Sequence, residues 1–475
     1  MIFNSVDFLL FLIIVFILYC FFCKNNLKIQ NALLFISSYI FYAWWDWRFL
    51  FLLLTSTCID YFFGLIIDSK EGNVRKLYLW LSIFNNLVIL FFFKYYNFFA
   101  ESFAILMEQF GLSVHPVILN LLLPVGISFY TFHGMSYVFD IYNRKILPEK
   151  NYFIYALFVS FFPLLVAGPI ERATHLLPQI KEERKFNYTQ SVEGLRLILW
   201  GFFKKVVIAD SLAETVDRIF ANHDSLSGST LLLGAIYFSI QIYGDFSGYS
   251  DIALGVAKLF GFELLSNFRF PYFSRDIAEF WRRWHISLSS WFKDYLYIPL
   301  GGSKSGKWKT VGNTFIIFLV SGFWHGANFT FITWGGIHAI LFMPLLLFKV
   351  NRKNFGDIVA VNRRLPTFKD FIQISFTFFC VTIAWIFFRS PDVLFALNYI
   401  NNIFSGLFKA PQYISLIPYV VILIAFDWLN RHNERRVLVF FNNKVLRYIL
   451  YFTLAMAIVL HFKFTDQTGF IYFQF

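Results

Sequence analysis

A series of apolar runs, separated by short polar breaks, constrains this chain more than any other feature. The bilayer core holds no water to satisfy backbone polar groups, so a single run crosses it as a helix of about 20 mainly apolar residues. Such runs lie near residues 5–23, 31–46, 49–67, 77–97, 117–140, 152–170, 193–212, 229–243, 311–323, 327–349, 371–389, 412–429 and 445–463. We therefore predict an all-α, polytopic integral membrane protein with roughly 11–13 membrane helices, plus re-entrant or interfacial helices where runs are marginal.

The composition agrees with this prediction. Hydrophobic residues make up 58% of the chain and charged residues only 15%, whereas soluble domains average about 25% charged residues. The net charge of +12 arises largely in the breaks between runs, such as "DSKEGNVRK", "IKEERK" and "GGSKSGKWK". Basic breaks of this kind are typical of cytoplasmic loops that face anionic lipid headgroups, and they do not indicate nucleic-acid binding.

The runs predict one membrane domain over residues 1–475, because no internal repeat, flexible linker or soluble domain interrupts them. Within it we expect N-terminal helices at 1–115 and, after a long polar loop at 351–370, C-terminal helices at 371–475. No metal site is expected. The cysteines all lie in apolar runs. Asp245 and Asp251 are six residues apart, a spacing that does not place both on one helical face. The glycines beside these two acids are instead typical of a polar cavity.

The segment "YFSRDIAEFWRRWHISLSSWFKDYLYIPLGG" (272–302) does not fit a simple span. It holds too many charges for a lipid-exposed helix and too many aromatics for a solvated loop. This mixture favours an amphipathic helix that lies at the interface or dips into a protein-lined cavity. Asp276 and Glu279 suit a first helical turn, and Arg282 is expected to face Glu279. A structural belt with its own salt bridges is the alternative, although ionisable residues in membranes usually mark function.

The segment "LVSGFWHGANFTFITWGGIHAILFMPLLLF" (319–348) is almost entirely apolar, yet it carries His325, Asn328 and His338. On a continuous helix His325 and Asn328 would project from one face. Gly322 and Gly326 either leave room for substrate beside the imidazole or allow close helix packing. His338 is expected to be structural, because no partner pattern accompanies it.

Six segments occur in a fixed order: "LPVGISFYTF", "FFPLLVAGPIER", "WGFFKKVVIADSLA", "QIYGDFSGYSDIALG", "NFRFPYFSRDIAEFWRRWHISLSSWFKDYLYIPLGGS" and "SGFWHGANFTFITWGGIHA". Together with the closing "GFIYFQF", they resemble the membrane-bound O-acyltransferase family, and within it the bacterial branch that acetylates alginate and peptidoglycan. The resemblance implies a catalytic core at residues 116–345 and a ring of helices around a tunnel that crosses the membrane.

The resemblance also implies where the chemistry takes place. His325 occupies the position of the family's catalytic histidine, and His285 that of the second histidine of this branch. The residues expected to position the donor or substrate are Asn328, Arg282, Trp324, Asp245 and Tyr243. No metal takes part in this scheme.

Acyl transfer from a thioester to a hydroxyl needs a base near the attacking oxygen and hydrogen-bond donors for the developing oxyanion. Imidazole titrates near neutrality, and burial favours its uncharged form, so His325 suits the role of base. The alternative is that His325 takes the acetyl group itself as a nucleophile. Asn328 is expected to orient the ring or to donate to the oxyanion.

The implied function is a membrane O-acetyltransferase of the bacterial inner membrane. It would move an acetyl group from a cytoplasmic donor, expected to be acetyl-CoA, towards an extracytoplasmic polysaccharide such as peptidoglycan or an alginate-like polymer. No cofactor is expected to be bound permanently. The chain carries no "GxSxG" or "GDS" esterase-like domain, so an SGNH-like extracytoplasmic transferase is expected as a partner. Two alternatives stay open: a transporter or channel, and D-alanyl transfer to teichoic acid within the same family.

Overall fold

The computed structural model describes residues 1–23, 26–119, 121–166, 168–304, 306–356, 358–433, 438–439, 441, 443–463 and 469–471. Throughout these residues the backbone forms helices, turns and irregular segments without a strand. The prediction of an all-α protein is confirmed. The last four residues of "GFIYFQF" lie outside the described part of the chain.

Contacts divide the chain into two compact units, Met1–Asn187 with Leu259–Leu264 and Tyr188–Lys258 with Leu265–Phe475. The sequence-based boundaries at residues 115, 345 and 371 delimit a catalytic core inside one membrane domain. The division into units does not test them, and they stay a prediction.

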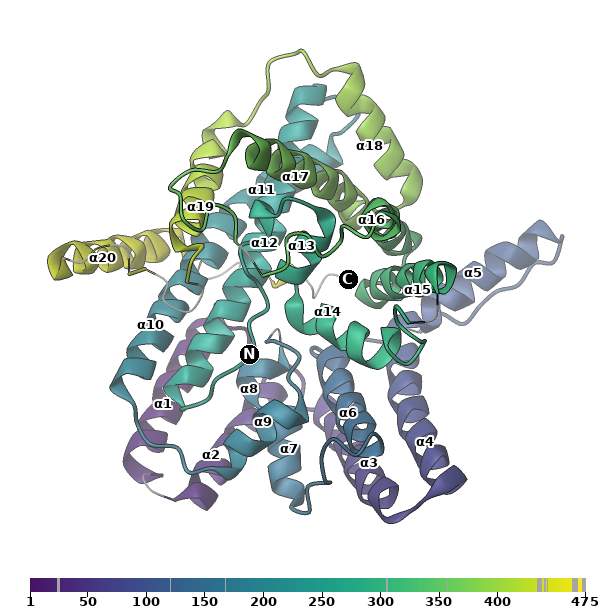
Figure 1. Ribbon diagram of the computed structural model, residues 1–475, viewed down its shortest axis with the longest axis vertical. Helices are drawn as coiled ribbons and strands as arrows, with labels where there is room; N and C mark the ends of the chain where they lie inside the picture. The colour runs from purple at the N-terminus through teal and green to yellow at the C-terminus, as the bar shows by residue number, and fades with distance from the viewer. Residues whose placement is uncertain are drawn as a thin grey trace. The chain divides into compact units, whose positions relative to one another are not determined.

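The first unit consists of helices α1 (Val6–Phe22), α2 (Leu27–Ala43), α3 (Phe49–Ser69), α4 (Gly72–Leu90), the π-helix η1 (Phe91–Tyr95), α5 (Tyr96–Gln109), α6 (Ile127–Tyr142), α7 (Tyr152–Ser160), α8 (Phe162–Leu165) and α9 (Ala173–Lys181). Helices α3, α4 and α6 pack side by side (Figure 1). Between them Asp60 of α3 accepts hydrogen bonds from Ser82 Oγ (2.7 Å) and Asn86 Nδ2 (2.8 Å) of α4. Because all three side chains are buried, these bonds offset the cost of removing the polar groups from water.

The second unit consists of α10 (Tyr188–Phe202), the π-helix η2 (Phe203–Ala209), α11 (Asp210–Ala221), α12 (Gly228–Leu259), the 3-10 helix η3 (Pro271–Phe273), α13 (Ile277–Arg283), α14 (Ile286–Phe292), the π-helix η4 (Lys293–Tyr297), α15 (Lys307–His325), α16 (Phe329–Leu347), α17 (Phe368–Arg389), α18 (Val393–Ser405), the 3-10 helix η5 (Ile414–Leu416), α19 (Ile417–Asn430) and α20 (Lys444–His461). The short helices α13 and α14 lie near α15, α16 and α17 (Figure 1), and α13 contacts both α14 and α16.

Helices α15 and α16 form a hairpin whose backbones approach closely. A Cβ on Gly322 would lie 2.2 Å from the backbone oxygen of Phe331, and one on Gly335 would lie 2.2 Å from that of Phe318. No larger residue fits at either position without moving the helices apart. Of the two explanations for Gly322, the structure therefore supports close helix packing.

Within the described residues, five helical segments are long and apolar enough to cross a membrane: Phe49–Ser69, Gly72–Gln109, Phe329–Leu347, Phe368–Arg389 and Lys444–His461. Three shorter apolar segments accompany them: Val6–Phe22, Val393–Ser405 and Ile414–Asn430. The chain is an integral membrane protein.

The expected number of roughly 11–13 membrane helices was a count of apolar runs, and several runs do not become one long apolar helix. The run that begins at residue 152 is divided between α7 and α8. The run at 193–212 is interrupted by η2, which carries the buried Lys204 and Lys205. Local breaks and buried charges thus shorten the apolar segments, and the larger number stays a prediction.

Candidate active site

His325 is the last residue of α15, and its side chain is buried (3% exposed). The helix stops there because Gly326 is extended, with φ at −166°. The next helix begins after Asn328, whose Oδ1 accepts a hydrogen bond from the backbone N–H of Thr330 (3.0 Å) as an N-cap. The expectation that His325 and Asn328 share one helical face is therefore wrong, because two separate helices meet between them.

The side-chain amide of Asn328 hydrogen-bonds to the backbone of two separate segments. Besides capping α16, its Nδ2 donates to the backbone oxygen of Pro391 (2.7 Å), just beyond α17. These two bonds hold together the start of α16 and the turn between α17 and α18. Asn328 thus fixes the chain that follows His325, while its expected roles toward the ring or an oxyanion stay predictions.

His285 lies at the junction of α13 and α14 in a backbone conformation that is rare for a residue with a side chain. Its φ is 43° and its ψ is 54°, which is the left-handed region. Asn267 holds this turn, since its backbone oxygen accepts from Ile286 N (2.9 Å) and its Oδ1 accepts from Ser287 Oγ (2.6 Å). Strain of this kind is often found at functional sites, and it points the buried ring of His285 inward.

The segment that carries His285 does not span the membrane, since α13 and α14 have seven residues each. Burial lowers the pKa of the His285 imidazole to about 3. The ring is therefore uncharged at neutral pH. An uncharged imidazole can accept a proton or donate a hydrogen bond through one nitrogen.

Trp324 lies between the two predicted catalytic histidines. Its ring centroid is 4.8 Å from that of His325 and 6.2 Å from that of His285. On its other side, His285 packs edge-on against Phe246 of α12, with centroids 4.7 Å apart. The structure thus brings His285, His325 and Trp324 together, while their catalytic and positioning roles stay predictions.

Four aromatic residues, Trp324, Trp334, Trp385 and Phe388, form what is here named the aromatic enclosure of His325. The centroids of Trp334 and Phe388 lie 5.2 Å and 5.3 Å from that of His325. Trp385 stands behind both, 5.4 Å from Trp334 and 5.1 Å from Phe388. All four are buried. Nothing in the spacing of the sequence pointed to Trp334, Trp385 or Phe388, because they come from α16 and α17.

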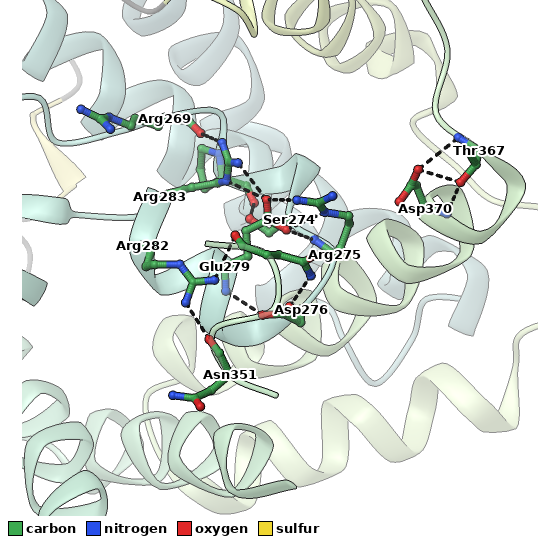
Figure 2. Close-up of polar contacts among 12 residues, drawn as sticks. Arg269, Ser274, Arg275, Asp276, Glu279, Arg282, Arg283, Asn351, Thr367 and Asp370 are labelled. Carbon is green, nitrogen blue, oxygen red and sulfur yellow. Dashed lines mark hydrogen bonds and ion pairs between the residues drawn. The ribbon is translucent and has the colours of Figure 1, made fainter. Parts of the chain in front are cut away.

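Arg275, just before α13, and Arg283, its last residue, form a clamp around Glu279 (Figure 2). Arg275 Nε and Arg283 Nη2 lie 3.0 Å and 2.8 Å from the Glu279 carboxylate, which is 1% exposed. Asp276 caps the helix by accepting from Glu279 N (2.7 Å). The clamp closes on the helix that leads directly into His285, so it fixes the position of that turn.

Arg282 does not take part in this clamp, and the expectation that it faces Glu279 is wrong. Its guanidinium donates instead to the backbone oxygens of Asn351 (2.9 Å) and Asn354 (3.4 Å), in the loop after α16, and the first of these bonds is visible in Figure 2. Arg282 therefore ties α13 to that loop. Its predicted role in positioning the donor or substrate stays a prediction.

Tyr243 and Asp245 of α12 are held by partners within the same unit. Tyr243 OH donates to Asp427 Oδ2 (2.6 Å), and Asp245 pairs with Lys205 Nζ (2.7 Å). Asp245 also accepts from the backbone N–H of Ile471 (2.6 Å). These contacts support the helix that presents Phe246 to His285. A role for Tyr243 and Asp245 at a substrate stays a prediction.

A cavity of about 750 Å³ lies beside α15. Trp281, Phe318 and Ser321 form part of its wall. Ser321 is one helical turn before His325, which corresponds to about 6 Å along the helix axis. Ser321 is therefore the residue of the cavity wall that lies closest in the chain to His325.

Four basic side chains also line this cavity: Lys293, Lys307, Lys349 and Arg352. Sequence reasoning did not single out any of them for the site. Lys307 lies in "GGSKSGKWK", which was interpreted only as a topology marker. Basic groups around a cavity favour an anionic ligand.

Comparisons with known proteins agree with this arrangement. The model of the membrane-bound O-acyltransferase family matches residues 40–388, which include both His285 and His325. The chain belongs to the membrane-bound O-acyltransferase family. It is 40% identical to the probable alginate O-acetylase AlgI of Pseudomonas putida over 386 residues, covering 80% of this chain and 75% of that protein.

Two further relatives indicate the range of the family. A peptidoglycan O-acetyltransferase of Helicobacter pylori is 36% identical over 408 residues, covering 80% of this chain and 75% of that protein. A teichoic acid D-alanyltransferase of Bacillus subtilis is 30% identical over 275 residues, covering 55% and 68%. The family prediction is confirmed, and this member of the membrane-bound O-acyltransferases is an enzyme of acyl transfer.

This acyltransferase shows no metal-binding cluster among its described residues: no group of three or more His, Cys, Asp or Glu side chains lies close enough to hold an ion. The site instead offers two buried imidazoles, an indole between them and a basic cavity nearby. These groups are suited to proton transfer and to binding an anionic ligand.

Proposed function

We propose that this chain is a membrane O-acetyltransferase that passes an acetyl group from cytoplasmic acetyl-CoA towards an extracytoplasmic polysaccharide. The single observation that carries the proposal is the buried His325 at the end of α15, one turn beyond the wall of a cavity lined by basic side chains. The printed names of the relatives, an alginate O-acetylase and a peptidoglycan O-acetyltransferase, favour acetyl as the acyl group and a polysaccharide as the final acceptor.

In the proposed reaction the cavity holds the donor, and Lys293, Lys307, Lys349 and Arg352 face its phosphates. The thioester reaches past Ser321 to His325. The acceptor oxygen attacks the thioester carbonyl carbon while His325 takes its proton, the carbon–sulfur bond breaks, and His325 returns the proton to the departing thiolate. In the alternative route His325 first takes the acetyl group on a ring nitrogen and then passes it to the acceptor.

His285 and Trp324 are proposed to position the reacting groups. His285 is uncharged and fixed by its strained turn, so one nitrogen can donate a hydrogen bond to the developing oxyanion. The site lies in the bacterial inner membrane in this proposal. A separate SGNH-like transferase outside the cell receives the acetyl group and completes the transfer to polymer.

The test uses purified protein in proteoliposomes with acetyl-CoA labelled in the acetyl group. We expect label to pass to an added extracytoplasmic acceptor protein, and we expect His325→Ala to abolish this transfer while the protein remains folded. His461→Ala is the control, because His461 lies at the end of α20 and contacts Tyr419. Wild-type turnover in His325→Ala would refute the assignment. Transfer from D-alanyl carrier protein but not from acetyl-CoA would favour the D-alanyl alternative.

A further inference from the structure

The aromatic enclosure does more than bury His325, because it leaves little space beside the ring on which the acyl group must lie. Trp324, Trp334 and Phe388 all have ring centroids within 5.3 Å of the imidazole centroid. Interiors packed in this way tolerate an added methylene group only by moving side chains. The next question is which of these rings limits the acyl chain.

Phe388 is the ring of the enclosure that contacts His325 from outside the hairpin that carries the histidine. It lies near the end of α17, whereas Trp324 belongs to α15 and Trp334 to α16, which carry and pack against the histidine. Phe388 packs against Phe331 (4.8 Å) and Trp334 (5.2 Å) as well as His325. Its ring therefore closes one side of the space beside the imidazole.

The backbone at Phe388 is held on both sides, so the ring is fixed in place. Arg389 Nη2 pairs with Asp217 Oδ1 (2.6 Å), and Ser390 Oγ donates to Ile386 O (2.7 Å). One residue further on, Pro391 O accepts from the Asn328 side chain. Because these contacts do not involve the ring, truncating Phe388 should leave open space rather than a collapsed helix end.

We propose that Phe388, backed by Trp334 and Trp385, determines the length of the acyl chain that the site accepts and restricts it to acetyl. This inference rests on the proposed function, in which the acyl carbon moves from a thioester sulfur to an acceptor oxygen at His325. A pocket that is one methylene too short discriminates by about 10–200-fold for each added methylene. Wild-type enzyme is therefore expected to use acetyl far better than butyryl thioesters.

The experiment measures kcat/KM for thiol release from acetyl-, propionyl- and butyryl-coenzyme A, with the same extracytoplasmic acceptor protein as in the test of the proposed function. We expect Phe388→Ala to lower the acetyl-to-butyryl ratio at least about tenfold. Phe387→Ala is the matched control, because Phe387 is a buried phenylalanine on the same helix but points about 100° away from Phe388 around the axis. Its ratio is expected to equal that of the wild type.

Three outcomes would overturn the proposal: an unchanged ratio in Phe388→Ala, an equal shift in Phe387→Ala, or wild-type enzyme that uses butyryl as well as acetyl. If Phe388→Ala loses all activity, Phe388→Leu decides, and its ratio must fall in the same direction. His325→Ala is assayed in parallel with all three donors. Activity in that variant would refute the proposed function, whereas an inactive His325→Ala with an unchanged Phe388→Ala ratio would refute only the proposal on chain length.

Discussion

Replacing Glu279 with glutamine removes the charge at the centre of the α13 clamp and leaves the side chain's shape nearly unchanged. The Glu279 carboxylate accepts five hydrogen bonds, three from Arg275 and two from Arg283, at 2.8–3.2 Å. The side chains of the two arginines are only 14% and 12% exposed. The variant therefore removes the carboxylate charge that is in direct contact with two largely buried guanidinium groups.

Breaking a buried ion pair by removing one partner costs about 3–5 kcal/mol. The sum over five charged hydrogen bonds would be larger, but water and neighbouring carbonyl groups recover part of it. For a unit of this size, about 2–4 °C of unfolding midpoint corresponds to 1 kcal/mol, so we expect Glu279→Gln to lower the midpoint by about 6–20 °C. Acetyl transfer should also fall, because α13 leads directly into His285.

The assay is thermal unfolding of the purified protein in detergent, followed by tryptophan fluorescence. Glu214→Gln is the matched control. Glu214 pairs with Arg218 at the same four-residue spacing, but the two side chains are 73% and 56% exposed, and such exposed pairs are worth about 0.3–0.5 kcal/mol. If Glu279→Gln lowers the midpoint no more than Glu214→Gln does, the argument that the clamp stabilises the active-site turn is wrong.

Two further predictions concern helix packing and pH. Gly322→Ala would place a Cβ 2.2 Å from the backbone oxygen of Phe331, so it should destabilise the hairpin by about 1–3 kcal/mol. Gly312→Ala is the control and should leave the stability unchanged, because its new Cβ would meet no neighbouring element within 4 Å. Equal unfolding midpoints for the two variants would contradict this reasoning. For His285 the folded pKa of about 3 lies below the ordinary value of 6.5. Between these two pH values the unfolded chain therefore binds a proton on this imidazole, and the folded protein does not. Stability should therefore fall as pH drops from about 6.5 towards 3. His285→Asn should show a weaker pH dependence of the unfolding midpoint there, and an unchanged profile would argue against a buried, uncharged His285.

Some of the site was predictable because its residues are close together in the chain. The segment around His285 is marked by its mixture of charges and aromatics, and His325 by its apolar surroundings. Other expectations failed for a local reason that the sequence pattern hides. Arg282 and Glu279 do lie on one helix, but Glu279 pairs with Arg275 and Arg283. Arg282 donates instead to backbone oxygens of the loop after α16, and the sequence does not show where that loop lies.

The sequence by itself determined the class of this protein, because long apolar runs have no favourable state other than helices in a bilayer, and it identified both histidines through their resemblance to a family. The tertiary structure decided what surrounds them. Phe388 reaches His325 from α17, which begins 39 residues after the start of α16 (Phe368 against Phe329). The basic side chains of the cavity come from three separate segments. Contacts of this kind depend on how helices pack against one another, and neither helical periodicity nor local composition contains that information.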